Sequence, residues 1–301
     1  ACAPRARHFI VRVPRFTREL NQYCYTQNAS SNVLCTTQTP TTTLANGNVR
    51  FGISMRYLVL TDIHANLEAL EGCMADAGRR GYDRILVLGD LVGYGADPNA
   101  VIDRVLDLNP HAIVRGNHDK VACGLEAADG FNSVARNAAR WTFETLTDEH
   151  RAWLVALPQG PILVDDLIEI CHGSPSDEDS YIFDELDAAR ALKSGSRPLC
   201  LFGHTHHPAV FELAHEGLDS AWPLDSAEHI VKLVKGSRYL LNPGSVGQPR
   251  DGDPRAAYAV VDEEARQVEL FRVKYAVADA QAKIVKAGLP EILAQRLAVG
   301  R

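Results

Sequence analysis

The chain has 301 residues, of which 46% are hydrophobic and 23% charged, and its formal net charge is −7. This length and hydrophobic content allow one sizeable core, or one core with an appendage. The acidic balance, without a long block of lysine and arginine, argues against a stable nucleic-acid partner. No apolar run approaches the roughly 18 residues that a membrane span requires, which argues against a membrane protein.

Residues 1–54 differ from the rest of the chain. They hold six arginines and one acid, Glu19, whereas the remainder holds 25 basic and 37 acidic residues. The stretch TTQTPTTTLANGNVRFGIS has weak hydrophobic periodicity and many turn formers, which predicts poor order. Three interpretations stand: a translated leader or misplaced start, an arginine-rich targeting peptide, or a disordered arm. Met55 opens MRYLVLTDIHANLEAL, and we expect the functional domain to begin there.

The cysteines favour a reduced, cytoplasmic protein. Four of the seven lie beyond residue 54, none of them in a C-x-x-C pair: Cys73, Cys123, Cys171 and Cys200. That spacing is typical of free thiols rather than of a disulfide framework or a structural zinc site.

From residue 55 the chain alternates short β-branched runs with amphipathic stretches. Three early runs predict strands: residues 57–60, 84–89 and 111–116. Each precedes a stretch with helical periodicity: residues 66–80, the segment after Pro98, and the region around residues 133–146. This alternation predicts an α/β domain that begins with parallel βαβ units.

The later runs predict strands with hairpin-like connections: ILVDDLIEIC, PLCLFG, AVFEL, HIVKLVKGSRYLLN, AAYAVVD and QVELFRV. The second half of the domain should therefore be more antiparallel. We place the domain at residues 55–275. The tail at residues 276–301 has helical spacing and predicts two helices, interrupted at Pro290 and packed on the domain.

Polar side chains gather where the predicted strands end. In chain order the motifs are D-x-H, G-D, G-N-H-D, H-G and G-H-T-H. Ligands of open α/β sheets lie beyond the carboxyl ends of the strands. Period-two spacing would also point Asp62 and His64 to one side, and His204 and His206 likewise. The candidate metal ligands are Asp62, His64, Asp90, Asn117, His172, His204 and His206.

These candidates offer oxygen and nitrogen donors without thiolates, a set that suits divalent Mn, Fe, Co, Ni or Zn. They are too many for one tetrahedral ion and fit two divalent ions that share a carboxylate. Two such ions can clamp a phosphoryl group and lower the pKa of a bound water. A single histidine at a strand end is usually an ordinary polar residue, but independent placement at five strand ends explains the pattern poorly.

The five motifs, in this order, resemble the calcineurin-like metallophosphoesterase superfamily over residues 55–262. The segments GDLVGYGADPN and NPGSVGQPRDGDPRAAYAVVD resemble its small bacterial phosphodiesterase-like branch, which includes relatives of the symmetric diadenosine tetraphosphatases. The resemblance implies a four-layer α/β/β/α sandwich with two mixed β-sheets. It also implies how the ligands divide: Asp62, His64 and His206 on one ion, Asn117, His172 and His204 on the other, and Asp90 as the bridge.

His118 matches the catalytic histidine of the family and would stay free to stabilise charge or to protonate the leaving oxygen. Arg115 and Arg250 are weaker candidates for phosphate contact, the latter because a guanidinium fork suits phosphate. The alternative for the segment around Arg250 is a rigid loop beneath the site. Residues 174–186 follow His172 and are a candidate rim or lid, whose acids would disfavour an anionic substrate if they faced the cleft.

We therefore expect a dinuclear metal-dependent phosphoesterase in which a metal-bound hydroxide attacks a small phosphodiester or phosphomonoester. Alternatives on the same centre are a dinucleoside polyphosphate hydrolase and a protein phosphatase. Against the latter, Gly93 and Tyr94 stand where protein phosphatases of the superfamily carry an acid and an arginine. The alternative from another class is a non-catalytic metal-binding scaffold. The motifs do not select the substrate, because loops around such a centre choose the leaving group. Assembly into a homo-oligomer is compatible with the sequence.

Overall fold

The computed structural model describes residues 54–221 and 228–301. The leader predicted for residues 1–54 therefore lies, except for its last residue, outside the described residues. In the part that is described, no helix has both the length and the apolar character needed to cross a membrane.

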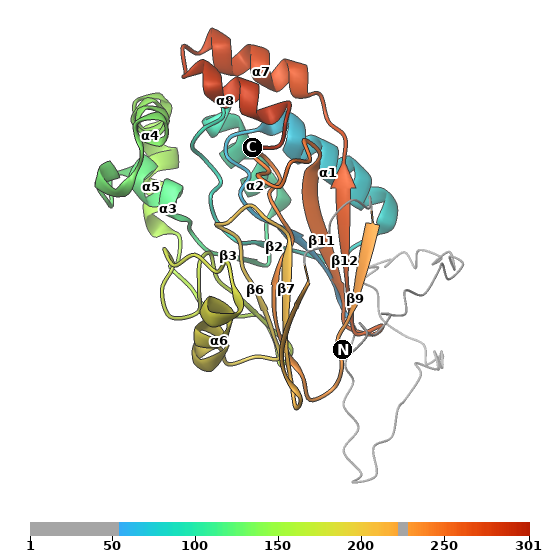
Figure 1. Cartoon of the computed structure of the whole chain (residues 1–301). Coiled ribbons are helices and arrows are strands. Elements are labelled where there is room, and N and C mark those ends of the chain that lie inside the picture. The colour runs from blue at the N-terminus through green and yellow to red at the C-terminus, as the bar shows by residue number, and fades with distance from the viewer. Residues whose placement is uncertain (1–53, 222–227) are drawn as a thin grey trace, which may run out of the picture. The chain divides into compact units, whose positions relative to one another are not determined.

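Two six-stranded mixed sheets form the centre of the domain (Figure 1). The first sheet contains β1 (Arg56–Leu60), β2 (Arg84–Val87), β3 (Ala112–Ile113), β9 (Glu228–Lys232), β11 (Ala256–Asp262) and β12 (Gln267–Val273). The second contains β4 (Ile162–Leu163), β5 (Ile168–Ile170), β6 (Leu199–Leu201), β7 (Ala209–Ala214), β8 (Gly217–Ala221) and β10 (Arg238–Asn242). The strand orders are β3-β2-β1-β11-β12-β9 and β4-β5-β6-β10-β7-β8.

Each sheet contains three neighbouring parallel strands. β1, β2 and β3 run parallel in the first sheet, and β5, β6 and β10 do so in the second. The remaining pairings are antiparallel, including β11 against β1 and β7 against β10. Each sheet therefore presents several carboxyl ends at one edge, where ligands of α/β sheets lie.

Eight α-helices complete the described part of the chain: α1 (Leu67–Arg80), α2 (Pro98–Leu108), α3 (Asn117–Cys123), α4 (Ser133–Thr145), α5 (Asp148–Ala156), α6 (Glu185–Ser194), α7 (Val277–Lys286) and α8 (Glu291–Leu297). Helix α1 begins where the side chain of Asn66 accepts a hydrogen bond from the Ala69 amide at 3.1 Å, a regular N-cap. Pro98 opens α2, a position where its missing N–H costs nothing.

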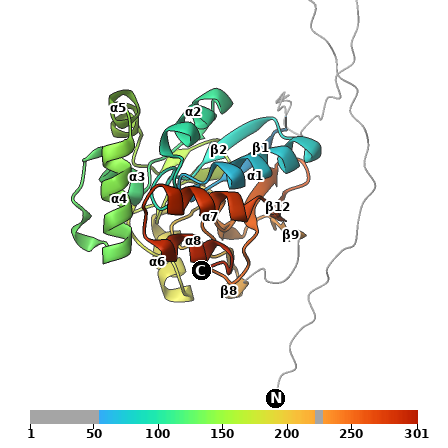
Figure 2. The same cartoon turned by 90° about the horizontal axis from the view of Figure 1, so that it is seen from above.

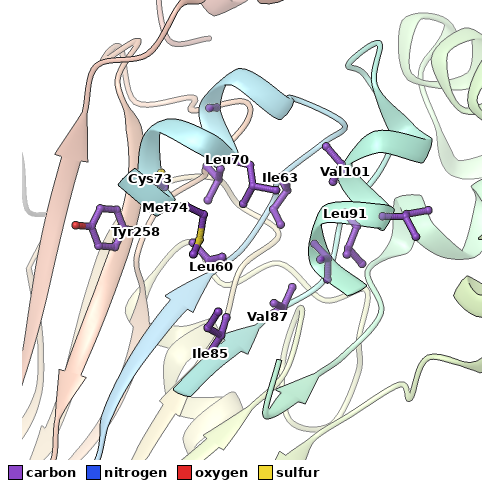
Figure 3. Packing of buried hydrophobic residues seen from close by; sticks show 14 of the residues in the cluster. Leu60, Ile63, Leu70, Cys73, Met74, Ile85, Val87, Leu91, Val101 and Tyr258 are labelled. Atoms are coloured by element: carbon purple, nitrogen blue, oxygen red, sulfur yellow. The ribbon is translucent and has the colours of Figure 1, made fainter. Parts of the chain in front are cut away.

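The four layers follow from the alternation of buried side chains along the strands. In β1, Tyr57 and Val59 belong to the apolar cluster between the two sheets. Leu58 and Leu60 point the other way, into a cluster that includes Leu70 of α1 (Figure 3). On the outer face of the second sheet, apolar residues of β7 and β10 pack against α6. The result is the predicted α/β/β/α sandwich.

The run 162–171 forms the antiparallel pair β4 and β5, which agrees with the hairpin-like connections expected of the later runs. Several other elements differ from the sequence-based prediction. The run 229–242 contains β9 and β10, which belong to different sheets. Helices α3, α5 and α6 and strand β8 were not predicted. Strand β8 has the polar sequence GLDSA and is held by its pairing with β7, which periodicity along the chain does not reveal.

The C-terminal helices α7 and α8 lie side by side (Figures 1 and 2). Pro290 stands at the N-cap of α8, so the two helices are separate. Ile284 and Leu293 pack in a cluster with Ala138 of α4 and with Tyr94, whose ring also contacts the candidate site. These helices therefore support one wall of that site.

Candidate metal centre

The seven candidate ligands converge from five strand ends. Asp62 and His64 follow β1, Asp90 follows β2, Asn117 opens α3 after β3, His172 follows β5, and His204 and His206 follow β6. Ligand atoms of six of them form two buried groups, in each of which all atoms lie within 4.8 Å of one another: Asp62, His64, Asp90 and His206 in one, Asp90, His172 and His204 in the other. Asn117 joins the second group, since its Oδ1 lies 3.3 Å from Nε2 of His172.

Asp90 belongs to both groups. Its Oδ1 accepts a hydrogen bond from the backbone N–H of His118 at 2.9 Å. Its Oδ2 lies 3.5 Å from Nε2 of His64 and 3.4 Å from Nε2 of His172. This oxygen is buried and has no hydrogen-bond partner among the described residues. A buried carboxylate oxygen without a partner costs free energy, so the arrangement fits a shared cation at this position.

The backbone of the ligands is not a continuation of the strands. Five of them have positive φ angles between 50° and 67°: Asp62, His64, Asp90, His204 and His206. Period-two alternation, from which we expected Asp62 and His64 to share a side, is therefore the wrong reason for their convergence. Left-handed conformations of non-glycine residues are strained and gather at functional sites. The surrounding contacts must hold them.

Each candidate histidine donates a hydrogen bond from one ring nitrogen to a backbone carbonyl. Nδ1 of His64 donates to Val92 at 3.1 Å, and Nδ1 of His172 donates to Leu88 at 2.7 Å. Nδ1 of His206 donates to Gln248 at 2.6 Å, and Nε2 of His204 donates to Asp179 at 3.0 Å. Since a carbonyl only accepts, these bonds fix the tautomer and leave the other ring nitrogen of His64, His204 and His206 with a lone pair for a metal. The other ring nitrogen of His172 faces Asp90, and a metal would take the place of its proton.

The turn-rich segment after β10 supports the ligand loops from below. The side-chain amide of Asn242 donates to the Gly203 carbonyl at 2.7 Å. The hydroxyl of Ser245 donates to the Asp62 carbonyl at 2.8 Å, and the Gly247 amide donates to the same oxygen at 2.9 Å. These contacts hold the loop that carries Asp62 in its strained conformation.

The electrostatics favour a cation at the shared position. Burial opposes ionisation of Asp90, yet His172 and His118 hold the pKa of its carboxyl well below the ordinary value. Burial would lower the pKa of His172, but Asp90 raises it to about 10. Burial lowers the pKa of His64 and His206 well below the usual value, which keeps both neutral. A buried carboxylate that holds one imidazole protonated, beside two neutral imidazoles, is a place where a divalent metal can replace a proton.

His118 lies beside the two groups but does not join them. Its ring, 4% exposed, packs 4.9 Å from the ring of His64, 4.3 Å from Tyr94 and 4.5 Å from Phe131. Its Nδ1 has no hydrogen-bond partner within the described part of the chain. Burial lowers the pKa of this imidazole to about 4. The ring is therefore neutral and near the centre.

The two candidate arginines differ in their surroundings. The guanidinium of Arg115 donates twice to the carboxylate of Glu178, each time at 3.0 Å, so its fork is occupied. Arg250 donates from Nη2 to the Tyr94 hydroxyl at 3.3 Å and to Oε1 of Gln248 at 3.2 Å. Its Nε is buried without a partner among the described residues. The backbone N–H of Arg250 donates to the His206 carbonyl at 3.4 Å, so Arg250 lies beside a candidate ligand.

Two acids of the rim, Glu178 and Asp179, are paired with cations. Glu178 pairs with Arg115, and Asp179 accepts from the ammonium of Lys120 at 2.9 Å. The rim contributes instead an aromatic residue that the sequence-based prediction missed: the ring of Tyr181 stacks 3.9 Å from that of His204. Only its place in a segment directly after a ligand pointed to it.

The match to known proteins agrees with this geometry. Residues 55–266 match the model of the calcineurin-like phosphoesterase superfamily domain, and the chain belongs to this family. A metallophosphoesterase from Sphaerobacter thermophilus, of known structure, is 41% identical and superposes with a TM-score of 0.73, covering 82% of this chain and 100% of that one.

Two archaeal proteins are also similar. An uncharacterized protein of Methanocaldococcus jannaschii is 38% identical over 256 residues, which are 81% of this chain and 97% of that protein. A hypothetical protein of Pyrococcus horikoshii has a TM-score of 0.65 at 22% identity, covers 82% of this chain and 98% of that one, and supports the fold.

Proposed function

We propose that the protein hydrolyses a small phosphodiester or phosphomonoester at a dinuclear metal centre. The observation that carries this proposal is the buried Oδ2 of Asp90, which lacks a partner among the described residues and faces imidazoles of both ligand groups. Asp62, His64 and His206 would hold one divalent ion with Asp90, and Asn117, His172 and His204 would hold the other. Ions bound there would polarise phosphoryl oxygens and lower the pKa of a bound water.

The chain's own residues would then bind and orient the ester. His118 is neutral near pH 7, so a ring N–H can donate a hydrogen bond to a phosphoryl or leaving oxygen. An approaching phosphate anion favours protonation of this ring, and proton donation to the leaving oxygen would follow. Arg250, whose Nε has no partner among the described residues, would add a charged donor to a phosphoryl oxygen.

The expected substrate is small and the expected location is the cytoplasm. The four cysteines in the described residues are free and buried, which suits a reducing compartment. Gly93 packs so closely on His118 that the acid found there in protein phosphatases would not fit without movement, which favours a small ester over a phosphoprotein.

The test is the hydrolysis of bis(p-nitrophenyl) phosphate and of p-nitrophenyl phosphate with Mn²⁺ added. We expect metal-dependent turnover that falls by about 10²–10⁴-fold in His118→Ala, the usual range for general acid–base catalysis. Asn117→Ala should lose turnover as well. The exposed His215 in the turn between β7 and β8 gives a control, since His215→Ala should retain full activity.

Calorimetric titration with Mn²⁺ separates binding from catalysis. The native protein and His118→Ala should bind two equivalents, and Asn117→Ala fewer. If the folded protein binds two metals but hydrolyses neither ester with Mn, Fe, Co, Ni or Zn, the proposal fails and the scaffold function replaces it.

A further inference from the structure

Two exposed aromatic rings extend from the candidate metal centre to the surface. Tyr181 and Phe183, both in the rim between β5 and α6, are 46% and 49% exposed. Their rings stack at 5.3 Å with an interplanar angle of 9°. On the inner side, Tyr181 stacks on His204 at 3.9 Å and 22°. The ring centroids of His207 and Phe183 lie 6.3 Å apart, with the two rings nearly perpendicular. A nearly parallel series of rings thus leads outward from a candidate ligand.

The loop that carries these rings is held in place from both sides. The ammonium of Lys120 lies 2.6 Å from the Asp179 carboxylate and 3.2 Å from that of Glu178. Glu178 also pairs with Arg115 at 3.0 Å, and the Asp179 carbonyl accepts from His204. These contacts hold Tyr181 and Phe183 exposed rather than folded into a core. Such preorganisation lowers the cost of binding a partner.

The inner ring also reaches the phosphate-binding side of the site. Its neighbour in the stack, His204, belongs to the same buried ligand group as Asp90 and His172. A phosphoryl group held at these ligands would therefore lie beside the ring series.

We infer that Tyr181 and Phe183 form a subsite for a planar nucleobase of a small nucleotide ester whose phosphate lies at the centre. This inference rests on the proposed function, and it adds the class of substrate. Every base has a flat π-face, and stacking on aromatic side chains binds bases of any sequence. One stacked pair accommodates one base, and the net charge of −7 disfavours a long polyanion, so the ligand is a nucleotide and not a nucleic acid.

Binding is measured by calorimetry on the full chain with two equivalents of Mn²⁺. The probes are the methylene phosphonate analogues of adenosine 5′-phosphate and of ribose 5-phosphate, in which CH₂ replaces the ester oxygen and prevents hydrolysis. They differ only in the base. We expect the adenosine analogue to bind about 10-fold more tightly, which corresponds to one stacked base.

Phe183→Leu should remove this preference, because leucine keeps apolar surface but offers no flat ring. Tyr181→Phe should keep it, since the ring series stays intact. Phe143→Leu is the matched control: Phe143 is also an exposed aromatic, at 42%, but lies on α4 outside the rim. Equal affinity for the two analogues, no binding of either, or a preference that survives in Phe183→Leu would overturn the inference.

The measurement also separates this inference from the proposed function. A base preference without turnover of any ester would retain the subsite and reject the phosphoesterase. Turnover without a base preference would do the reverse. If the rings only seal His204, Phe183→Leu would weaken both analogues equally and leave their ratio unchanged, which also rejects the subsite.

Discussion

Replacing Gly93 with alanine should displace His118 and leave the candidate metal ligands in place. Gly93 has a φ of +90°, and a Cβ at this position would lie 2.6 Å from Nδ1 of His118. That ring is packed between neighbouring rings, 4.9 Å from His64 and 4.3 Å from Tyr94, so it has little space to move. The backbone strain alone costs about 1–3 kcal/mol. A misplacement of the ring by about 1 Å should lower kcat about 10²-fold.

Two other glycines separate the strain from the overlap. Gly81 has a similar φ of +81° and no atom within 4 Å of the added Cβ, so Gly81→Ala carries strain without a clash. Gly78, inside α1, also has open space, and Gly78→Ala should stabilise the protein by about 0.5–1 kcal/mol. The assays are urea unfolding, hydrolysis of bis(p-nitrophenyl) phosphate, and calorimetric titration with Mn²⁺.

We expect Gly93→Ala to bind two equivalents of metal, to lose more unfolding free energy than Gly81→Ala, and to lose turnover that Gly81→Ala retains. The same unfolding free energy and the same kcat in these two variants would show that contact between Gly93 and His118 does not position the ring. The reasoning from the overlap would then be refuted.

Two further predictions concern stability. Leu60 is fully buried, so Leu60→Ala should lower the free energy of unfolding in urea by about 2–5 kcal/mol. The side chain of Leu186 is 60% exposed, so Leu186→Ala should change this free energy by less than about 0.5 kcal/mol. Similar losses in both variants would contradict the assigned core. The second prediction concerns pH and the metal-free protein. Burial lowers the pKa of four imidazoles of the site: His64, His118, His204 and His206. These imidazoles are neutral in the folded protein and take up protons when it unfolds. Their contribution to the free energy of unfolding is therefore complete above the unfolded pKa of about 6.5. It is lost as the pH falls toward about 4, the pKa of His118 in the folded protein. Burial also raises the pKa of Asp62 and Asp119 to about 7, and Asp90 raises that of His172 to about 10. These three groups act in the opposite direction, His172 only in the upper part of the window, but they oppose four imidazoles. With EDTA present the melting temperature should therefore fall between pH 7 and pH 4.5, and a constant or rising value would contradict the prediction.

Local patterns determined the elements whose stability is mostly local. Apolar runs predicted β1 and β2, and helical spacing predicted α1, α2 and α4 as well as the two helices on either side of Pro290. The identity and order of the candidate ligands also came from the sequence, because each polar motif directly follows an apolar run. The resemblance of these motifs to a family supplied the sandwich, which no periodicity alone would have given.

Helix α3 shows where local patterns end. It is only seven residues long, and it begins where the Asp119 carboxylate accepts from the Gly116 amide at 2.9 Å. The same carboxylate accepts from the Val92 amide at 3.2 Å, so the start of the helix is fixed by a distant loop. Strands β9 and β10 are similar, since only their partners decide that they belong to different sheets.

The sequence by itself determined which donors the protein offers, where they stand along the chain and which strands precede them. Only the tertiary structure decided how they meet. Five ligands adopt left-handed backbone conformations that their local sequence disfavours, and hydrogen bonds from distant segments, such as that of Ser245 to Asp62, hold them there. Two other contacts also join segments far apart in the chain: Arg115 pairs with Glu178, and Tyr181 stacks on His204. Their energies depend on distances that exist only after the two sheets have packed, so patterns between neighbouring residues carry no record of them.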